Sequence, residues 1–368
     1  MIGALRQFFS GGGRSSEGVT VPPMDGALKP NQLLESAHVE LAIPEPDNLA
    51  CDGDRLLFSS ARSLFAVNPS DGWKTAKQVA TFQSDITALA CNNARDYAVG
   101  LDDGQIMMSG RGGAASVVEI PGRLAPTAMA FDDQGDLFVC AGSATRSPTQ
   151  WKRDLMERNE TGSIWKLDMR TRGATRLASG LAYPYGIAIS ASTGELIVTE
   201  SWKHRLLAIP RAGGAAAQKP RVVLDHLPGY PARIVPDASG YWLCVFAPRG
   251  QLIELILRET GFRTRMMATV HPDYWMAPAL SSGRSFLEPL QLGSLRTMGT
   301  VKPWAPTRSY GLVIRLDADG QPTGSAHSRS DGNRHGVTSC VPWGAELFVT
   351  SKGGDVILSI PVASFGEA

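Results

Sequence analysis

A short phrase recurs six times along the chain, and this recurrence limits the possible fold more than any other feature. Each copy has a small or polar residue, an apolar pair, a turn rich in Asp and Gly, and then a β-rich run. The copies are DNLACDGDRLLFSS from Asp47, TALACNNARDYAVG from Thr87, TAMAFDDQGDLFVCAG from Thr127, YGIAISASTGELIVTE from Tyr185, ARIVPDASGYWLCVF from Ala232 and GVTSCVPWGAELFVTS around Thr338. The first three copies begin 40 residues apart, a period that suits a four-stranded propeller blade. Six copies predict an all-β, six-bladed β-propeller.

Each copy is followed by a second apolar run, which we expect to be the neighbouring antiparallel strand. These runs are SLFAVN, QIMMSG, GSIWKLD, HRLLAIP, QLIELIL and DVILSI. The 39 Gly and 24 Pro residues are typical of many short strands joined by tight turns. Helical repeats are excluded, because the units are broken by Gly and rich in β-branched residues. The segment HVELAI, before the first copy, is predicted to supply an outer strand that closes the ring.

Two insertions interrupt the period. The first, SATRSPTQWKRDLMERNETG in blade three, includes QWKRDLMER, which we predict to form a short helix. The second runs from about residue 258 to 308 and is placed between blades five and six. Long insertions in a regular scaffold are usually lids or binding loops, so we expect both at the open end of the central channel. The predicted organisation is a flexible tail over residues 1–21 and a single propeller domain over residues 22–368.

Charge and hydropathy exclude several classes of function. The 36 Lys and Arg residues nearly balance the 35 Asp and Glu residues, so no global field attracts nucleic acid. No run approaches the roughly 18 apolar residues of a transmembrane helix. The apolar run in MIGALRQFF is too short for a signal peptide; it is interpreted as a frayed tail or, alternatively, a surface anchor. We expect a cytoplasmic protein with a small-molecule substrate, and the sequence leaves the oligomeric state open.

The sequence contains no familiar catalytic or metal-binding motif. The five cysteines are far apart, with no CxxC pair; they are Cys51, Cys91, Cys140, Cys244 and Cys340. We expect buried thiols in a reducing compartment rather than disulfides. A nucleophile elbow, a phosphate-binding glycine loop and an HExxH motif are all absent from the sequence.

Several longer phrases carry a family resemblance. They are PPMDGALKPNQLLE, GLAYPYGIAIS followed by ELIVTESWKHRLLAI, LPGYPARI followed by GYWLCVF, and YGLVIRLDADGQP followed by HGVTSCVPWGAELFVTSKGGDVILSI. Over residues 22–361 the chain resembles bacterial strictosidine-synthase-like proteins, which are related to the gluconolactonase and paraoxonase six-bladed propellers. The resemblance implies a small-molecule site at the central channel.

For the lactonase branches, the resemblance implies a central calcium ion held by a Glu, two Asn and an Asp from loops that open successive blades. Hard cations take oxygen ligands of this kind. The matching positions hold Asp47 with Asn48 and Glu45 beside it, Thr127, Tyr185, and Ala232 followed by Arg233. One carboxylate beside a guanidinium is a poor cation site. We therefore predict no metal and no other cofactor, with calcium the one ion that the resemblance suggests.

For the plant strictosidine synthases, the resemblance implies a single Glu as the acid–base group of an amine–aldehyde condensation. The matching position is about Thr338, whose hydroxyl cannot exchange a proton with an iminium intermediate at neutral pH. His335, three residues earlier, is a possible substitute if its loop points inward.

Asp47, Tyr185 and His335 are the predicted catalytic residues. Asp47 or His335 would activate water, and Tyr185 would donate to the substrate. Arg233 is predicted either to bind an anionic group of a ligand or to pair with Asp47 across the channel in place of the lost cation. The structural alternatives are an Asx turn at Asp47, packing of Tyr185 in the channel and a structural histidine.

The other predicted substrate-binding residues open a blade or belong to the second insertion. Asn48, Thr127 and Thr338 open blades one, three and six. His271, Tyr274 and Trp275 form either an aromatic lid over an apolar ligand or a small satellite core beneath a long loop.

These features predict a small-molecule enzyme that hydrolyses an ester, a lactone or a related carbonyl compound. The alternatives are a metal-free amine–aldehyde condensation and a non-catalytic propeller that binds a ligand or a protein. Polar groups that converge in a pocket would favour an enzyme, whereas a channel plugged by Tyr185 and Trp275 would favour a binding scaffold.

Overall fold

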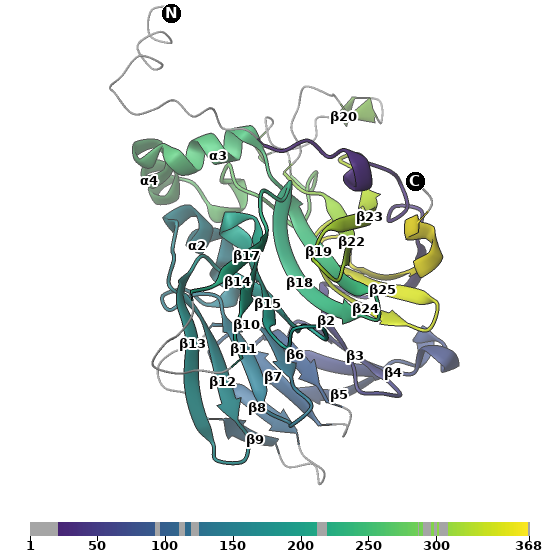
Figure 1. Ribbon diagram of the computed structural model, residues 1–368. Coiled ribbons are helices and arrows are strands. Elements are labelled where there is room, and N and C mark those ends of the chain that lie inside the picture. The colour runs from purple at the N-terminus through teal and green to yellow at the C-terminus, as the bar shows by residue number, and fades with distance from the viewer. Residues whose placement is uncertain are drawn as a thin grey trace, which may run out of the picture.

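Six four-stranded antiparallel sheets stand around a common axis in the computed structural model (Figure 1). The structure describes residues 21–92, 96–109, 115–118, 125–211, 219–285, 287–289, 296–297, 300–301 and 308–366. The innermost strand of each sheet contacts the innermost strands of both neighbouring sheets, so the ring is closed. The predicted six-bladed propeller is confirmed, and all of the predicted tail except residue 21 lies outside the described residues.

The four strands of each blade follow one another from the axis outward. Blade one contains β2 (Pro46–Cys51), β3 (Leu56–Ser60), β4 (Ser63–Val67) and β5 (Lys77–Thr81), and blade two contains β6 (Ile86–Cys91), β7 (Tyr97–Leu101), β8 (Ile106–Ser109) and β9 (Ala115–Val118). Blade three contains β10 (Pro126–Phe131), β11 (Leu137–Ala141), β12 (Gly162–Asp168) and β13 (Gly173–Leu181), and blade four contains β14 (Pro184–Ile189), β15 (Leu196–Glu200), β16 (Arg205–Ile209) and β17 (Arg221–Leu224). Blade five contains β18 (Gly229–Asp237), β19 (Gly240–Pro248), β22 (Gly311–Asp317) and β23 (Pro322–Ser328), and blade six contains β24 (Val337–Trp343), β25 (Glu346–Ser351), β26 (Val356–Pro361) and β1 (His38–Ala42).

Helices are few in the described part of the chain, and its α-helices lie in the insertions. They are α2 (Trp151–Glu157), α3 (Gln251–Arg258) and α4 (Thr260–Thr269). Short 3-10 helices cover Gly26–Leu28, Pro69–Asp71, Trp73–Thr75, Pro148–Gln150, Ser201–Lys203, Pro272–Tyr274 and Val362–Gly366. A two-stranded ribbon, β20 (Arg296–Thr297) and β21 (Thr300–Val301), stands apart from the blades.

Blade six is completed by the strand that precedes blade one. β1 pairs antiparallel with β26, with Val39 opposite Leu358 and Ala42 opposite Val356. The predicted closure by the HVELAI segment is therefore confirmed. Because β26 has a partner on both sides, its backbone groups do not form an exposed edge.

The second strand of each blade is buried because a neighbouring blade packs on each of its faces. Every residue of β11 and β15 is buried, and in β19 only Gly240 is half-buried. A strand that is covered on both faces takes apolar residues at consecutive positions, which explains the continuous runs in the sequence repeat. The outermost strands β5 and β17 are largely exposed.

Each innermost strand is irregular near its start. In all six, the pairing register with the second strand shifts there. A bulge of this kind redirects a side chain out of the regular alternation. The residues at or beside these bulges are Asp47 and Asn48, Thr87, Thr127, Tyr185, Ala232 and Arg233, and Thr338. These are the positions at which the copies of the sequence repeat open.

Both insertions lie inside a blade, between its second and third strands. The first places α2 between β11 and β12 of blade three. The sequence places the second insertion between blades five and six, which is wrong. It lies within blade five, between β19 and β22, because the segment YGLVIRLD forms the third strand of that blade.

The run QLIELIL, predicted to be a strand, is helix α3 instead. Ile253 and Ile256 are buried, and Leu252 and Leu257 pack beside them against the core, whereas Leu255 is exposed. Apolar residues three and four positions apart share one face of a helix, so burial of that face selects the helix over the strand.

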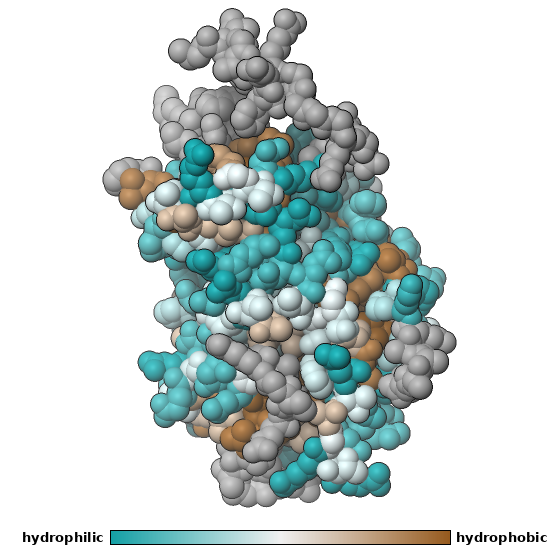
Figure 2. All heavy atoms as spheres, turned by 90° about the vertical axis from the view of Figure 1, so that its left-hand side faces the viewer, coloured by the Kyte–Doolittle hydropathy of each residue, from teal (hydrophilic) through white to brown (hydrophobic). Residues whose placement is uncertain are grey.

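The side of the molecule that carries the α-helices is mostly hydrophilic, with small apolar patches (Figure 2). Exposed large apolar side chains such as Leu255 and Phe262 are spread over several elements. Single exposed residues of this kind are normal on a protein surface. Among the described residues, no helix is long and apolar enough to cross a membrane.

We predict that the packing of blade six beside its closing strand contributes strongly to the stability of the ring. Leu358 is fully buried in β26, between β25 and the closing strand β1. Leu358→Ala leaves a cavity and should lower the free energy of unfolding by about 2–5 kcal/mol. The matched control is Val222→Ala in the outer strand β17, where the side chain is 44% exposed. Urea unfolding should show a change within about 0.5 kcal/mol for that control; equal losses in the two variants would contradict the prediction.

Candidate active site

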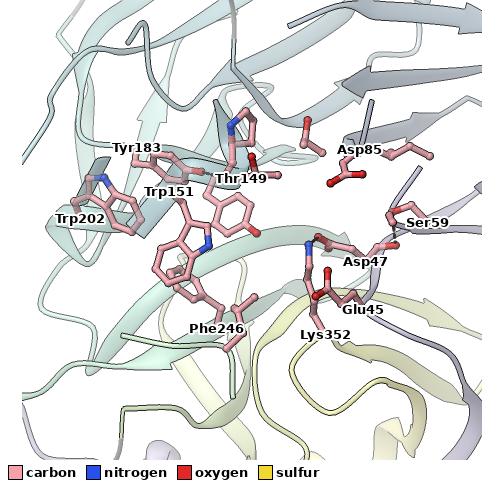
Figure 3. Close-up of a pocket in the computed structure, with 16 residues that line it drawn as sticks. Glu45, Asp47, Ser59, Asp85, Thr149, Trp151, Tyr183, Trp202, Phe246 and Lys352 are labelled. Atoms are coloured by element: carbon pink, nitrogen blue, oxygen red, sulfur yellow. Dashed lines mark hydrogen bonds and ion pairs between the residues drawn. The ribbon is translucent and has the colours of Figure 1, made fainter. Parts of the chain in front are cut away.

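A cavity of about 240 Å³ opens where the innermost strands begin, and both insertions contribute to its wall (Figure 3). One side of it is aromatic and consists of Trp151, Tyr183, Tyr185, Trp202 and Phe246. The opposite side is polar and includes Glu45, Asp47, Asp85, Thr87 and Lys352. Figure 3 shows this division: Trp151, Tyr183, Trp202 and Phe246 gather on one side, across from Asp85, Asp47, Glu45 and Lys352.

The aromatic side is a packed cluster. Tyr183 stacks on Trp202 with ring centroids 4.3 Å apart, and Trp151 meets Phe246 edge to face at 5.3 Å. Trp202 is further fixed by a 2.8 Å hydrogen bond from its Nε1 to Asp154 Oδ1. Tyr183 has a φ of 59°, a conformation rare for a bulky residue, and such outliers concentrate at functional sites.

Tyr185 joins the two sides of the cavity. It lies at the bulge of β14. The next residue is Gly186, and here blade five passes close to the backbone of β14. A Cβ atom at Gly186 would lie 2.5 Å from the carbonyl oxygen of Ala232. The guanidinium of Arg233 lies over the Tyr185 ring, 5.2 Å from its centroid.

Asp47 is the centre of the polar side. Its Oδ1 accepts hydrogen bonds from Arg233 Nη1 at 2.6 Å and from the Thr338 hydroxyl at 2.8 Å. Its Oδ2 accepts from Lys352 Nζ at 3.1 Å. Arg233 Nη2 also donates to the carbonyl oxygen of Thr87 at 2.7 Å. The predicted pair between Arg233 and Asp47 is therefore present, and it links blades one, two, five and six across the axis.

The charges in this network stabilise one another. Burial alone would raise the pKa of Asp47, but Arg233 and Lys352 outweigh burial and lower it to about 2. Burial opposes the charge on Lys352, yet Asp47 raises the pKa of that ammonium above its ordinary value. Burial and the charge of Asp47 raise the pKa of Tyr185. At neutral pH the site therefore presents an ionised Asp47, a charged Lys352 and a neutral phenol.

This arrangement does not fit the calcium ion that the resemblance implies for lactonases. Both oxygens of Asp47 already bind a cationic side chain. Asn48 donates from Nδ2 to Ser59 Oγ, and its Oδ1 is the remaining acceptor, with no hydrogen-bond partner in the described part of the chain. A single amide oxygen beside a guanidinium and an ammonium is no site for a divalent cation. Within the described ranges, no cluster of His, Cys, Asp and Glu could hold a metal.

Thr127 and Thr338 are buried on the axis and make structural contacts. The Thr127 hydroxyl donates to the carbonyl oxygen of Pro184 at 2.6 Å and so joins blades three and four. The Thr338 hydroxyl donates to Asp47 and lies 3.3 Å from that of Thr350. Neither side chain lines the cavity.

His335 is not brought to the cavity. Its Nδ1 lies 2.8 Å from the Ser309 hydroxyl, and its Nε2 lies 2.8 Å from the carbonyl oxygen of Arg329. The ring stacks beside Tyr310 and is nearly inaccessible to solvent. With both ring nitrogens bonded, His335 is placed as a structural histidine.

The three predicted lid residues do not share one site. His271 is exposed, whereas Trp275 is buried in the main core and donates from Nε1 to the carbonyl oxygen of Val270. Tyr274 and Trp275 line a second, wider cavity next to the first. Trp275 therefore does not plug the channel.

The predicted site residues do not include Lys352, Asp85 or most of the aromatic side. Lys352 directly follows β25, in a position equivalent to the turn after the second strand of the other blades. A lysine in the turn SKGG was the available signal. Asp85, which precedes β6, makes no hydrogen bond or ion pair through its side chain with any described residue. The aromatic residues come from blades four and five, the connection between blades three and four, and the first insertion, so no local pattern unites them.

Comparison with known proteins supports the predicted resemblance. A family model described as strictosidine synthase matches residues 127–208, which cover blade three and most of blade four. The Arabidopsis thaliana protein STRICTOSIDINE SYNTHASE-LIKE 10 is 27% identical over 135 residues, which are 36% of this chain and 36% of that protein. The match thus spans about a third of the curated relative. The resemblance to strictosidine-synthase-like propellers is confirmed over these blades.

Solved structures of similar fold include propellers with different names. A gluconolactonase from Xanthomonas campestris has a TM-score of 0.56 and 15% identity, with 88% of each chain covered. Regucalcin from Agrobacterium tumefaciens, a calcium-binding protein, has a TM-score of 0.53 and 14% identity, covering 88% of this chain and 93% of that chain. Both similarities concern the fold.

We predict that removing Arg233 destabilises the fold, because the buried Asp47 carboxylate loses a cationic partner. Arg233→Met should lower the free energy of unfolding at pH 7 by about 3–5 kcal/mol, because Asp47 then keeps a buried charge with one partner fewer. The folded-state pKa of Asp47, about 2, is below its ordinary value of 3.8. Its stabilising contribution is thus present above about pH 4 and is lost as the pH falls towards 2. The difference in the free energy of unfolding between the variant and the native protein should become smaller below pH 4.

Urea unfolding at pH 7 and pH 3 measures this difference. Arg221→Met is the matched control, because Arg221 forms a 2.9 Å ion pair with Glu195 and its side chain is 61% exposed. Its effect should stay within about 1 kcal/mol at both pH values. A loss in Arg233→Met that does not depend on pH would show that the charge of Asp47 is not its cause.

Proposed function

We propose that the chain is a small-molecule enzyme that hydrolyses an ester, a lactone or a related carbonyl compound in the first cavity, without a metal ion. The observation that carries this proposal is the Lys352 ammonium, held by Asp47 and turned to a cavity whose other side is aromatic. A concave, largely apolar site with a few convergent polar groups is typical of small-molecule binding.

The aromatic side would bind the body of the substrate. Trp151, Tyr183 and Phe246 offer ring faces and edges to a planar or broad apolar group. Because these rings are fixed by packing on one another, little conformational entropy is lost on binding. The carbonyl group would then point towards the polar side.

Lys352 and Tyr185 would stabilise the negative charge that develops on the carbonyl oxygen. The raised pKa of Lys352 keeps its ammonium protonated, so it serves as an electrostatic donor and not as an amine nucleophile. The raised pKa of Tyr185 keeps its phenol protonated, so its hydroxyl is also a donor. Asp47 holds the Lys352 ammonium in place and does not itself exchange a proton at neutral pH, since its pKa is about 2.

Asp85 would act as the general base. Its half-buried carboxylate lines the cavity and forms no hydrogen bond or ion pair with another described side chain. It would take a proton from a water molecule as the oxygen of that water attacks the carbonyl carbon. The proton would pass to the leaving alkoxide when the bond from the carbonyl carbon to that oxygen breaks, giving an acid and an alcohol.

A second candidate is the condensation of an arylalkyl amine with an aldehyde. The observation that favours it is the pair of carboxylates at Glu45 and Asp85, which lie across the cavity from the aromatic side. They could hold the ammonium group of an amine whose ring packs on Trp151. Asp85 would then be the acid–base group in the absence of a carboxylate at Thr338.

We also propose a cytoplasmic location. All five cysteines are free thiols, and Cys140, Cys244 and Cys340 are buried. Unpaired cysteines are typical of proteins in a reducing compartment.

We predict that Lys352→Met and Asp85→Asn each abolish most of the hydrolytic activity on a panel of aryl esters and aromatic lactones. Loss of the oxyanion donor should lower kcat/KM by about 10²–10³-fold. Loss of the general base should lower kcat by about 10²–10⁴-fold. Asp133→Asn, at a side chain that is 85% exposed, is the control and should keep native rates. A chelator should leave the native rate unchanged.

Steady-state kinetics of the four proteins decides between the candidates. Native rates of hydrolysis in both Lys352→Met and Asp85→Asn would refute the proposed catalytic roles of these two residues. Absence of hydrolysis together with consumption of an arylalkyl amine and an aldehyde would favour the condensation. Binding of these compounds without turnover would indicate a non-catalytic propeller.

A further inference from the structure

A second cavity of about 730 Å³ borders the first and lies between the two insertions. The two cavities share Glu45, Thr149, Trp151 and Leu280 in their walls. A ligand whose body packs on Trp151 in the first cavity could therefore extend into the second. Several charged residues line the second cavity, which sets it apart from the aromatic side of the first.

Two cations from different insertions meet in the wall of this second cavity. Lys152 belongs to α2, and Arg308 precedes β22. Lys152 Nζ donates to the carbonyl oxygen of Pro272 at 3.3 Å, and Arg308 Nη2 donates to that of Asp273 at 3.1 Å. Since these carbonyl groups belong to consecutive residues, the two positive charges lie close together.

Neither cation has a carboxylate partner among the described residues. The Arg308 side chain belongs to a residue only 2% exposed, and its Nε and Nη1 have no hydrogen-bond acceptor in the described structure. A buried guanidinium with unpaired donors is unfavourable by itself. Burial and the charge of Arg308 lower the pKa of Lys152 to about 8, although Asp273 and Glu288 oppose this.

Apart from Glu45, the other charged groups of the cavity are engaged elsewhere. Arg153 pairs with Glu157 at 3.0 Å, and Arg284 pairs with Asp355 at 3.2 Å. Glu288 accepts hydrogen bonds from the backbone amides of residues 283–285. Asp273 lies 3.5 Å from the ring of His271. Among the described residues, two cations without a carboxylate partner, Lys152 and Arg308, therefore stand against one carboxylate without an ion pair, Glu45, and the excess charge in this wall is positive.

We propose that Lys152 and Arg308 form a binding site for an anionic group, a carboxylate or a phosphate, of the molecule that occupies the first cavity. The anion would supply the acceptors that Arg308 lacks and would relieve the repulsion between the two cations. That this molecule is the substrate rests on the proposed function. The substrate would then be an acidic carbonyl compound with an apolar body. The anion site itself can be tested without turnover.

Isothermal titration calorimetry of the full-length chain at pH 7 tests the site with three probes: phenyl phosphate, inorganic phosphate and the neutral benzyl alcohol. Phenyl phosphate should bind at least tenfold more tightly than benzyl alcohol. Lys152→Met and Arg308→Met should each weaken the binding of phenyl phosphate at least tenfold, and Lys152→Arg should retain it. Arg265→Met, at an exposed arginine of α4 that lines neither cavity, should leave it unchanged.

The dependence on pH provides a readout that a merely structural role would not give. The charged groups that face Lys152 are Arg308, Asp273 and Glu288. Because the pKa of Lys152 is about 8, its positive charge is lost as the pH rises through 8. The affinity for phenyl phosphate should fall several-fold between pH 7 and pH 9.5. It should stay nearly constant in Lys152→Arg, whose guanidinium keeps its proton over this range.

The outcomes separate this inference from the proposed function. Equal affinities for phenyl phosphate and benzyl alcohol, or native affinity in folded Lys152→Met, would overturn the anion site whether or not esters are hydrolysed. Loss of hydrolysis in Lys352→Met bears on the first cavity alone. Circular dichroism establishes whether each variant is folded. If Arg308→Met does not fold, the affinity of Lys152→Met for phenyl phosphate tests the anion site.

Discussion

The ion pair between Asp47 and Arg233 is the interaction on which the centre of this propeller depends. Six blades bring their opening residues to one axis, where unpaired polar groups would be costly because water is excluded. Arg233 of blade five satisfies Asp47 of blade one and also binds the carbonyl oxygen of Thr87 in blade two, so one guanidinium joins three blades. Where the resemblance to lactonases implies a cation, this chain has the Arg233 guanidinium.

The pair of Arg233 and Asp47 also shapes the first cavity. Asp47 stays ionised, and its second oxygen fixes the Lys352 ammonium at the polar side. The aromatic side faces it because α2 and the 3-10 helix Ser201–Lys203 bring Trp151 and Trp202 over the channel mouth. The second cavity continues beyond Trp151, where Lys152 and Arg308 meet. An apolar body with a carbonyl group near one end and an anion at the other matches this succession of surfaces.

The architecture could be predicted because a propeller repeats one local pattern. The six phrases correspond to six strand pairs, and HVELAI closes the ring as expected. The errors fall where local pattern and tertiary context disagree. QLIELIL has the hydrophobicity of a buried strand, but its apolar residues share one helical face, and packing on the core selected the helix α3. The misplaced second insertion followed directly, since YGLVIRLD was left without a strand partner in blade five.

In the candidate site, too, the repeated pattern predicts some residues, and tertiary contacts alone place the others. The residues that open each repeat were accessible from the sequence, since periodicity alone places Asp47, Tyr185 and Arg233 at the axis. The sequence by itself thus determined the ring and its closure. Only the tertiary structure decided that Lys352 and Asp85 enter the cavity, that His335 does not, and that Lys152 meets Arg308. These contacts join residues far apart in the chain through insertions and turns, where no repeated pattern fixes the direction of a side chain.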